Sequence, residues 1–210
     1  GRVWDIEELN ALVSFCRKHN LILISDEIHA GLILDQDKKH IATGNIPDAA
    51  DILVTLQSAS KTFNMPGLGC AYAVVKNPIL RKKIKQIMNG IVHHVGALGF
   101  TATLAAYQNG KAWHSELIEY LRLNREQVEQ TLSPCDGLTV YHSEATYLTW
   151  IDARKMPVNN PSLYFEKFGV GLYDGAPFGA PGFLRLNYAC PNSILQEALK
   201  RIKSGLAELT

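Results

Sequence analysis

Two clusters of polar side chains in this 210-residue chain have the residue types that could carry chemistry. One is S-D-E-I-H at residues 25–29 and the other is S-A-S-K at residues 58–61, and each directly follows a short apolar run. A lysine amine acts as a nucleophile when it is desolvated and partly neutral, and burial at a strand end can arrange this. The ends of the two runs are therefore the first places to look for a site that binds or converts a small molecule.

The apolar runs predict neighbouring strands of one sheet. Residues 21–24 and 51–56 have the continuous apolar pattern of parallel strands that are buried on both faces. A third run, at residues 70–75, follows a turn at Pro66-Gly67 that is too short for a helical crossover, so we expect this strand to be antiparallel. Ligands of open α/β sheets bind beyond the carboxyl ends of the strands, which is where both polar clusters lie.

Helices alternate with these strands and with three later ones, which predicts a mixed α/β protein. A capping-box start at Asp5 and Glu8 precedes apolar residues at helical spacing and predicts a helix from about residue 6 to 19. We expect further helices on either side of an interruption near 89–96, at 111–132, near 161–168 and near 193–209, and strands at 146–151, 170–173 and 184–188. We assign residues 1–110 to a large domain and residues 111–210 to a small C-terminal α/β domain.

Composition and charge exclude several classes of protein. The net charge of +1, from 21 basic and 20 acidic residues, provides no broad basic surface for a nucleic acid. The uncharged residues 89–110 include histidines and small residues, so we expect no membrane segment. The four cysteines show neither CxxC nor zinc-ligand spacing, which favours reduced thiols, no metal site and a cytoplasmic location.

Three motifs, in this order, resemble the fold-type I aminotransferase superfamily of pyridoxal-phosphate (PLP) enzymes. They are S-D-E-I-H at 25–29, S-x-S-K-T-F-N-x-x-G-L at 58–68 and G-F-L-R-L-N at 182–187. More narrowly, the chain looks like the cystathionine β-lyase branch, the MalY/PatB-type carbon–sulfur lyases. The resemblance covers essentially the whole chain. It implies that residues 1–110 are the C-terminal part of a PLP-binding large domain with a mixed, mostly parallel sheet, and that the full-length protein is a homodimer.

The resemblance implies a role toward the cofactor for three residues. Lys61 would anchor PLP through its amine and carry the proton at the substrate Cα; a solvated surface lysine is the alternative. Asp26 would pair with the pyridine nitrogen and keep it protonated, whereas a helix N-cap is the alternative. His29 stands where many aminotransferases have a tyrosine that donates to the cofactor's phenolic oxygen. This substitution is typical of the lyase branch, and a structural histidine is the alternative.

Two anions, the cofactor phosphate and the substrate α-carboxylate, need further partners. The resemblance implies that Ser58 and Ser60 bind the phosphate together with backbone N–H groups, unless they are ordinary turn serines. Many members of the superfamily also have a phosphate-binding arginine eight residues after the lysine, but Gly69 stands at that position. Arg185 lies among apolar neighbours and is implied to bind the substrate carboxylate, with a structural ion pair as the alternative.

The expected activity is that of a PLP-dependent carbon–sulfur β-lyase, which releases a thiol, pyruvate and ammonia from cystathionine or cysteine S-conjugates. A class I/II aminotransferase is the alternative with the same cofactor, and a non-catalytic truncated module is the alternative of another class. The superfamily's N-P-x-N-P segment, glycine-containing phosphate loop and ring-stacking aromatic residue are absent from this chain. We therefore expect a C-terminal fragment that is not an efficient enzyme by itself.

Overall fold

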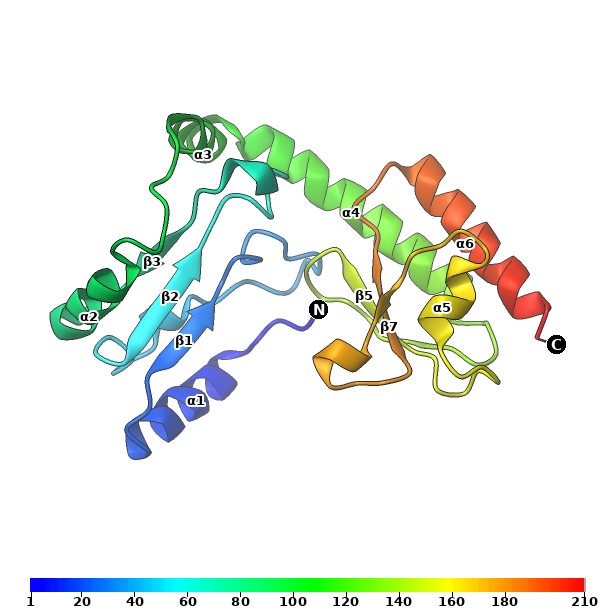
Figure 1. Cartoon of the computed structure of the whole chain (residues 1–210), viewed down its shortest axis with the longest axis horizontal. Coiled ribbons are helices and arrows are strands. Elements are labelled where there is room, and N and C mark those ends of the chain that lie inside the picture. The colour runs from blue at the N-terminus through cyan, green and yellow to red at the C-terminus, as the bar shows by residue number, and fades with distance from the viewer. Residues whose placement is uncertain (210) are drawn as a thin grey trace. The chain divides into compact units, whose positions relative to one another are not determined.

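The computed structural model describes residues 1–209 and divides into two compact units. The first unit contains Val3–Glu116, and the second contains residues 1–2 and 117–209. Each unit combines helices with one sheet (Figure 1), and the predicted α/β class is confirmed. The division falls inside helix α4 (Lys111–Leu132), whereas the assignment of residues 1–110 and 111–210 to a large and a small domain stays a prediction.

The sheet of the first unit has the strand order β1-β2-β3. Strand β1 (Leu23–Asp26) pairs in parallel with β2 (Leu53–Gln57), and β3 (Tyr72–Val74) runs antiparallel to β2. The predicted mixed sheet is therefore confirmed. The connection from β2 to β3, residues 58–71, contains no α-helix. It includes a 3-10 turn, Pro66–Leu68, which ends at Gly69 with a φ of 55°, a left-handed conformation that favours glycine.

Helix α1 (Ile6–Lys18) begins at the predicted capping box. The Asp5 carboxylate accepts from the Glu8 N–H at 2.8 Å, and the Asp5 N–H donates to the Glu8 carboxylate at 3.0 Å. One face of the helix packs against β2 and the loop before it. The buried cluster formed there consists of Leu9, Val13, Ile46, Ala49 and Leu53.

Strand β1 is not buried on both faces, contrary to the prediction from its apolar run. The side chains of Ile22 and Ile24 are 50% and 62% exposed. Ile22 and Ile24 are two residues apart and share one face of the strand, which no described segment covers, whereas Leu23 on the other face packs against the buried cluster. Strand β1 also lies at one edge of the sheet, with β2 as its one neighbour among residues 1–209. Tyr72 and Val74 on β3, the opposite edge, are exposed as well. The sheet thus exposes apolar side chains on both of its edge strands in the described residues.

Two helices follow β3, separated near residues 89–96 as predicted: α2 (Pro78–Met88) and α3 (Ala97–Asn109). Gly99 allows α3 to approach the turn before β3, because a Cβ atom at this position would lie 2.5 Å from the Leu68 carbonyl oxygen. No helix between residues 1 and 209 combines the length and the apolar character needed to cross a bilayer.

The second unit contains an antiparallel sheet with the strand order β4-β5-β7-β6. The strands are β4 (Thr139–Val140), β5 (Leu148–Asp152), β6 (Tyr173–Asp174) and β7 (Phe183–Asn187), and the remaining helices are α5 (Pro161–Glu166) and α6 (Asn192–Ala207). The strand predicted at 170–173 shares one residue with β6. Val170 and Leu172 are buried but do not pair with β7. Their apolar character therefore results from burial and does not indicate strand pairing.

Candidate active site

The carboxyl ends of β1 and β2 lie side by side because these strands are parallel (Figure 1). Asp26 is opposite Leu56 in the register, and the N–H of the next residue, Glu27, donates to the Leu56 carbonyl at 3.0 Å. Lys61 follows in the turn after β2. The structure thus brings Asp26 and the Lys61 turn to the same edge of one sheet, namely the edge formed by the carboxyl ends of its parallel strands. Ligands of α/β proteins bind there.

Asp26 ends its strand and begins a turn. Its Oδ1 atom accepts from the Ile28 N–H at 3.2 Å, and the turn that follows does not continue into a helix, so the helix N-cap interpretation is wrong. Its other carboxylate oxygen receives no hydrogen bond from residues 1–209. Asp26 is exposed, because its side chain lies on the same uncovered face of β1 as Ile24.

Lys61 lies in a tight turn whose backbone is fixed by hydrogen bonds. The Phe63 N–H donates to the Ala59 carbonyl and the Met65 N–H donates to the Ser60 carbonyl, each at 2.9 Å. The Lys61 side chain is exposed and, within residues 1–209, forms no hydrogen bond or ion pair. The predicted burial of its amine is therefore absent from the described part of the chain.

Ser58 and Ser60 interact within the same turn. The Ser58 Oγ lies 2.7 Å from the Cys70 carbonyl oxygen and 2.8 Å from the Ser60 Oγ, and it accepts from the Ser60 N–H at 3.0 Å. A hydroxyl has one proton to donate, so the buried Ser58 is fully engaged by its neighbours. Ser58 thus stabilises the turn that carries Lys61, while the Ser60 hydroxyl lies next to the lysine and is only half-buried.

A buried carboxylate next to Asp26 anchors the segment that follows β1. Glu27 accepts hydrogen bonds from His40 Nε2 at 2.8 Å, the Thr43 N–H at 3.0 Å and the Ser25 hydroxyl at 3.0 Å. Burial alone would raise the pKa of Glu27, but these hydrogen bonds more than offset it and hold the pKa below its ordinary value. The sequence contains no local signal for this network, because His40 and Thr43 are far from Glu27 along the chain.

His29 lies in the turn after β1, three residues beyond Asp26. The residue is half-buried and its Nδ1 atom is buried. Its position at the same sheet edge as Asp26 and Lys61 is the one expected, and its role toward a cofactor stays a prediction.

Arg185 belongs to the second unit, on strand β7. Its guanidinium carbon lies 4.7 Å from the ring centroids of both Tyr173 and Phe178. Its Nε atom is buried without a hydrogen-bond partner, and no acidic side chain of residues 1–209 pairs with it. The structural ion pair that was the alternative for Arg185 is therefore absent from the described residues, and the guanidinium has the capacity to bind an anion.

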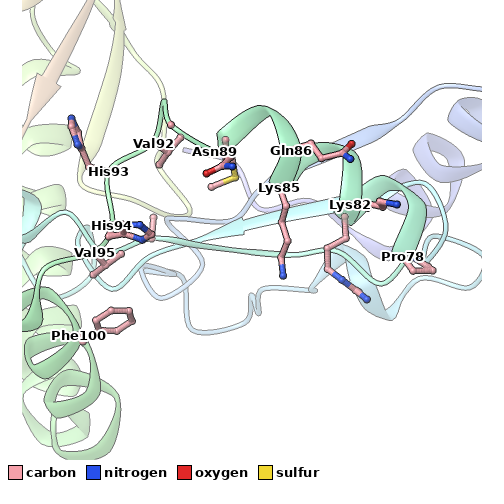
Figure 2. Close-up of a pocket in the computed structure, with 14 residues that line it drawn as sticks. Pro78, Lys82, Lys85, Gln86, Asn89, Val92, His93, His94, Val95 and Phe100 are labelled. Carbon is pink, nitrogen blue, oxygen red and sulfur yellow. The ribbon is translucent and has the colours of Figure 1, made fainter.

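A hollow of about 790 Å³ between α2 and the loop before α3 is separate from the Asp26–Lys61 edge. Figure 2 shows Lys85 and His93 at this hollow, with the imidazole of His93 turned away from the lysine. Every charged or histidine side chain that lines it is exposed. Exposed lysines and histidines of this kind are ordinary surface residues, so we assign no ligand to this hollow.

Open α/β sheets bind small ligands beyond the carboxyl ends of their strands, and in this chain an amine and a carboxylate follow two adjacent strand ends. Comparison with known proteins shows the family. Residues 1–202 match the family described as aminotransferase class I and II, and the chain belongs to this family.

The relatives include lyases as well as aminotransferases. The chain is 34% identical, over 99% of its length, to cystathionine β-lyase PatB of Bacillus subtilis, and 31% identical, over 95%, to protein MalY of Escherichia coli. Among solved structures, OvoB has a TM-score of 0.96 at 39% identity over 98% of the chain. Cystalysin from Treponema denticola, which contains a pyridoxal 5′-phosphate cofactor, has a TM-score of 0.93 at 30% identity over 100% of the chain.

The chain spans about half the length of these relatives: 55% of PatB, 52% of MalY, 54% of OvoB and 55% of cystalysin. These similarities confirm the predicted family, its resemblance to the cystathionine β-lyase branch and PLP as the family's cofactor. They also confirm, at the level of the family, the prediction of a lyase or aminotransferase. Lyase and transaminase chemistry are both represented, because an aspartate/prephenate aminotransferase of Aquifex aeolicus, described as probable, is 28% identical to this chain.

Proposed function

We propose that the full-length protein is a PLP-dependent carbon–sulfur β-lyase that converts cystathionine or cysteine S-conjugates to a thiol, pyruvate and ammonia. The observation that carries the proposal is the pairing of Lys61 and Asp26 at one sheet edge, each with a polar group that residues 1–209 leave unengaged. The similarity to PatB and to a PLP-bound carbon–sulfur lyase of Staphylococcus hominis, 30% identical, supports a lyase over other PLP chemistry.

The donor set at the sheet edge fits the chemistry of PLP. The aldehyde of PLP requires an accessible amine, and the exposed Lys61 supplies one. Its ring nitrogen requires a carboxylate, and Asp26 has an oxygen without a hydrogen bond from the described residues. The Ser60 hydroxyl and nearby backbone N–H groups suit its phosphate, while Gly69 leaves the position of the superfamily's phosphate-binding arginine unfilled.

The roles of the individual residues follow from their chemistry. When bound, PLP supplies a ring that accepts the electron pair left at the substrate Cα. The Lys61 amine removes the proton from that Cα, and the Asp26 carboxylate balances the positive charge on the ring nitrogen. His29 donates a hydrogen bond to the phenolic oxygen through its imidazole. Arg185 binds the substrate α-carboxylate with two parallel N–H groups, which holds the amino acid in one orientation.

Pyruvate formation from L-cystathionine tests the proposal. The full-length protein, loaded with PLP, is incubated with L-cystathionine without any keto acid, and pyruvate is measured with lactate dehydrogenase and NADH. We expect pyruvate from the natural protein, none above background from Lys61→Ala, and an unchanged rate from Lys76→Ala, which alters another exposed lysine of the same unit. Turnover only in the presence of a keto acid would identify an aminotransferase instead. A protein with no PLP absorbance and no turnover would be the non-catalytic module.

The location of the cofactor on the chain has its own test. Borohydride reduction of the PLP-loaded protein, followed by peptide mapping, is expected to find the cofactor on Lys61. Modification of a different lysine would contradict the assignment even if pyruvate is produced.

We also propose that the full-length protein is a cytoplasmic homodimer that acts on a small amino acid. The resemblance to fold-type I enzymes supports the homodimer, and the four free cysteines support a reducing compartment. Light scattering on the PLP-loaded, full-length protein tests the first part: a mass of two chains is expected, and a monomer at micromolar concentration would contradict it.

A further inference from the structure

The turn that follows β1 touches the turn that carries Lys61. A Cβ atom added to Gly31 would lie 2.6 Å from the Thr62 Oγ1 and 2.9 Å from its Cγ2. These distances leave no room for a side chain, so residue 31 must be glycine for the two turns to approach this closely. Thr62 is buried and directly follows Lys61, which makes this contact a direct link between the two halves of the site.

His114, near the start of α4, connects the same two turns. Its Nε2 atom lies 2.5 Å from the carbonyl oxygen of Gly31. A carbonyl oxygen only accepts, so Nε2 carries a proton and donates it to this bond. The His114 ring also packs against Phe63, with ring centroids 6.0 Å apart. The His114 imidazole thus contacts the backbone of the turn after β1 and the Phe63 side chain of the turn that carries Lys61.

Phe63 holds the Lys61 turn in place. Its ring stacks on Trp113 at 5.8 Å with an interplanar angle of 27°, and it meets the ring of Tyr107 edge-on at 6.2 Å. A Cβ atom added to Gly110 would lie 2.5 Å from the Phe63 Cε1, so the backbone closes on the ring from a further direction. Phe63 is two residues from Lys61 and cannot shift without disturbing the start of α4.

We propose that His114 and Phe63 are positioning residues that hold the Lys61 turn at a fixed distance from the turn that follows Asp26. The aldehyde and the ring nitrogen of PLP lie at opposite ends of its pyridine ring, so the amine and the carboxylate must be held one ring apart to act together. Strand pairing fixes Asp26 and the end of β2, but Lys61 lies beyond the last paired residue of that strand. The hydrogen bond from His114 to the Gly31 carbonyl, together with the packing of Phe63 against Tyr107 and Trp113, supplies the missing constraint. The role rests on the proposed PLP site.

The experiment compares variants of the full-length protein that keep or remove the hydrogen-bond donor. His114→Gln keeps an N–H for the Gly31 carbonyl, whereas His114→Leu removes it, and Phe63→Leu removes the aromatic contacts. His19→Gln is the matched control, because His19 is an exposed histidine on the same unit that contacts Phe15. PLP affinity is measured by absorbance titration, together with the pH midpoint of the bound-cofactor band and the melting temperature.

We expect His114→Leu and Phe63→Leu to weaken PLP binding by about tenfold or more and to shift the pH midpoint, because the amine and the carboxylate no longer face the ring together. His114→Gln and His19→Gln should stay within about twofold of the natural protein, because Gln restores the donor and His19 is remote from the site. The measurements are made well below each variant's melting temperature, and Phe63→Leu provides the comparison if His114→Leu does not fold.

Three outcomes would count against different claims. Variants that melt earlier but keep the natural affinity and pH midpoint would show that the contact is merely structural, and the positioning role would be overturned while the PLP site stands. A natural protein that binds no PLP would overturn the proposed function itself. Loss of affinity in His114→Gln equal to that in His114→Leu would also overturn the role of the hydrogen bond to Gly31.

Discussion

The guanidinium of Arg185 is charged, partly buried and unneutralised by any of residues 1–209. A charge in such a position is costly unless a partner compensates for it, and the two aromatic rings at 4.7 Å supply only part of that compensation. A carboxylate ligand would supply the rest. A guanidinium can form two parallel hydrogen bonds with a planar carboxylate.

Substituting Arg185 by lysine tests this role. Lysine keeps the charge but cannot form two parallel hydrogen bonds, so we expect the KM for L-cystathionine to rise by about tenfold or more, with a smaller change in kcat. Steady-state kinetics on the full-length protein measure both constants. Arg201→Lys is the control, since Arg201 forms an exposed ion pair with Glu197 on α6. An unchanged KM in Arg185→Lys would remove Arg185 from the substrate site.

Glu27 gives the first unit a pH-dependent stability. Its pKa is held below the ordinary value of 4.5, so its hydrogen bonds to His40, Thr43 and Ser25 contribute fully above the unfolded-state pKa. That contribution is lost as the pH falls through the lower pKa of the folded state. The carboxylate must be ionised to accept all of these donors at once.

We expect Glu27→Gln to lower the free energy of unfolding by about 1–3 kcal/mol at neutral pH. The free energy of unfolding should also fall less steeply toward acid pH in this variant than in the natural protein. Urea unfolding between about pH 7 and about pH 3 measures both effects. Glu116→Gln, at an exposed position of the same unit, should leave the curve as it is. An acid limb equally steep in Glu27→Gln would show that other carboxylates carry the pH dependence.

At the scale of elements, helix α1 depends on one buried face. Leu9 lies in the cluster with Leu53 of β2, whereas Phe15 points to solvent and contacts His19. We expect Leu9→Ala to lower the free energy of unfolding by about 2–5 kcal/mol, because it leaves a cavity in a packed cluster. Phe15→Ala should cost less than about 1 kcal/mol. Denaturant unfolding of both variants checks the difference, and equal costs would mean that α1 is packed on a different face.

Elements with a strong local signal were predictable from the sequence. Helix α1 begins at its capping box, and α4 spans the predicted residues 111–132. Strand β4 was not predicted, because two residues are too few to show a period. Strand β6 was placed too early, because the buried residues Val170 and Leu172 precede the residues that pair with β7. The particular side chains of β1 that are exposed could not be foreseen, because an apolar run does not reveal which of its faces a neighbouring segment covers.

In the candidate site, too, features that depend on neighbouring residues in the sequence were predictable, and contacts between distant residues were not. The parallel pairing of β1 and β2 places Asp26 and the Lys61 turn at one edge, and this followed from the apolar runs and the rule for strand ends. The contact between His114 and Gly31 joins residues that are distant in sequence, and no periodicity points to it. The predicted burial of Lys61 was wrong for the described residues, because burial depends on the whole surroundings of a turn.

At the scale of the whole molecule, the described chain exposes many large apolar side chains. Ile24 on β1, Ile91 after α2 and Leu98 on α3 are 62%, 75% and 76% exposed. Single exposed apolar residues are normal, but an edge strand with apolar side chains is a site for pairing with other chains. The relatives that the chain matches are about twice as long, so the described residues alone contain less chain than those folds use.

We therefore expect residues 1–210, expressed alone, to self-associate and to bind a hydrophobic dye such as ANS more strongly than the full-length protein does. Size-exclusion chromatography with light scattering, at several concentrations, measures the association, and dye fluorescence measures the accessible apolar surface. Ile24→Thr should weaken both effects, because it removes an exposed apolar group from the edge strand while keeping β-branching. A monomer of residues 1–210 that binds no dye at any concentration would show that the exposed strands do not drive association, and the sheet edge would then be stable without further chain.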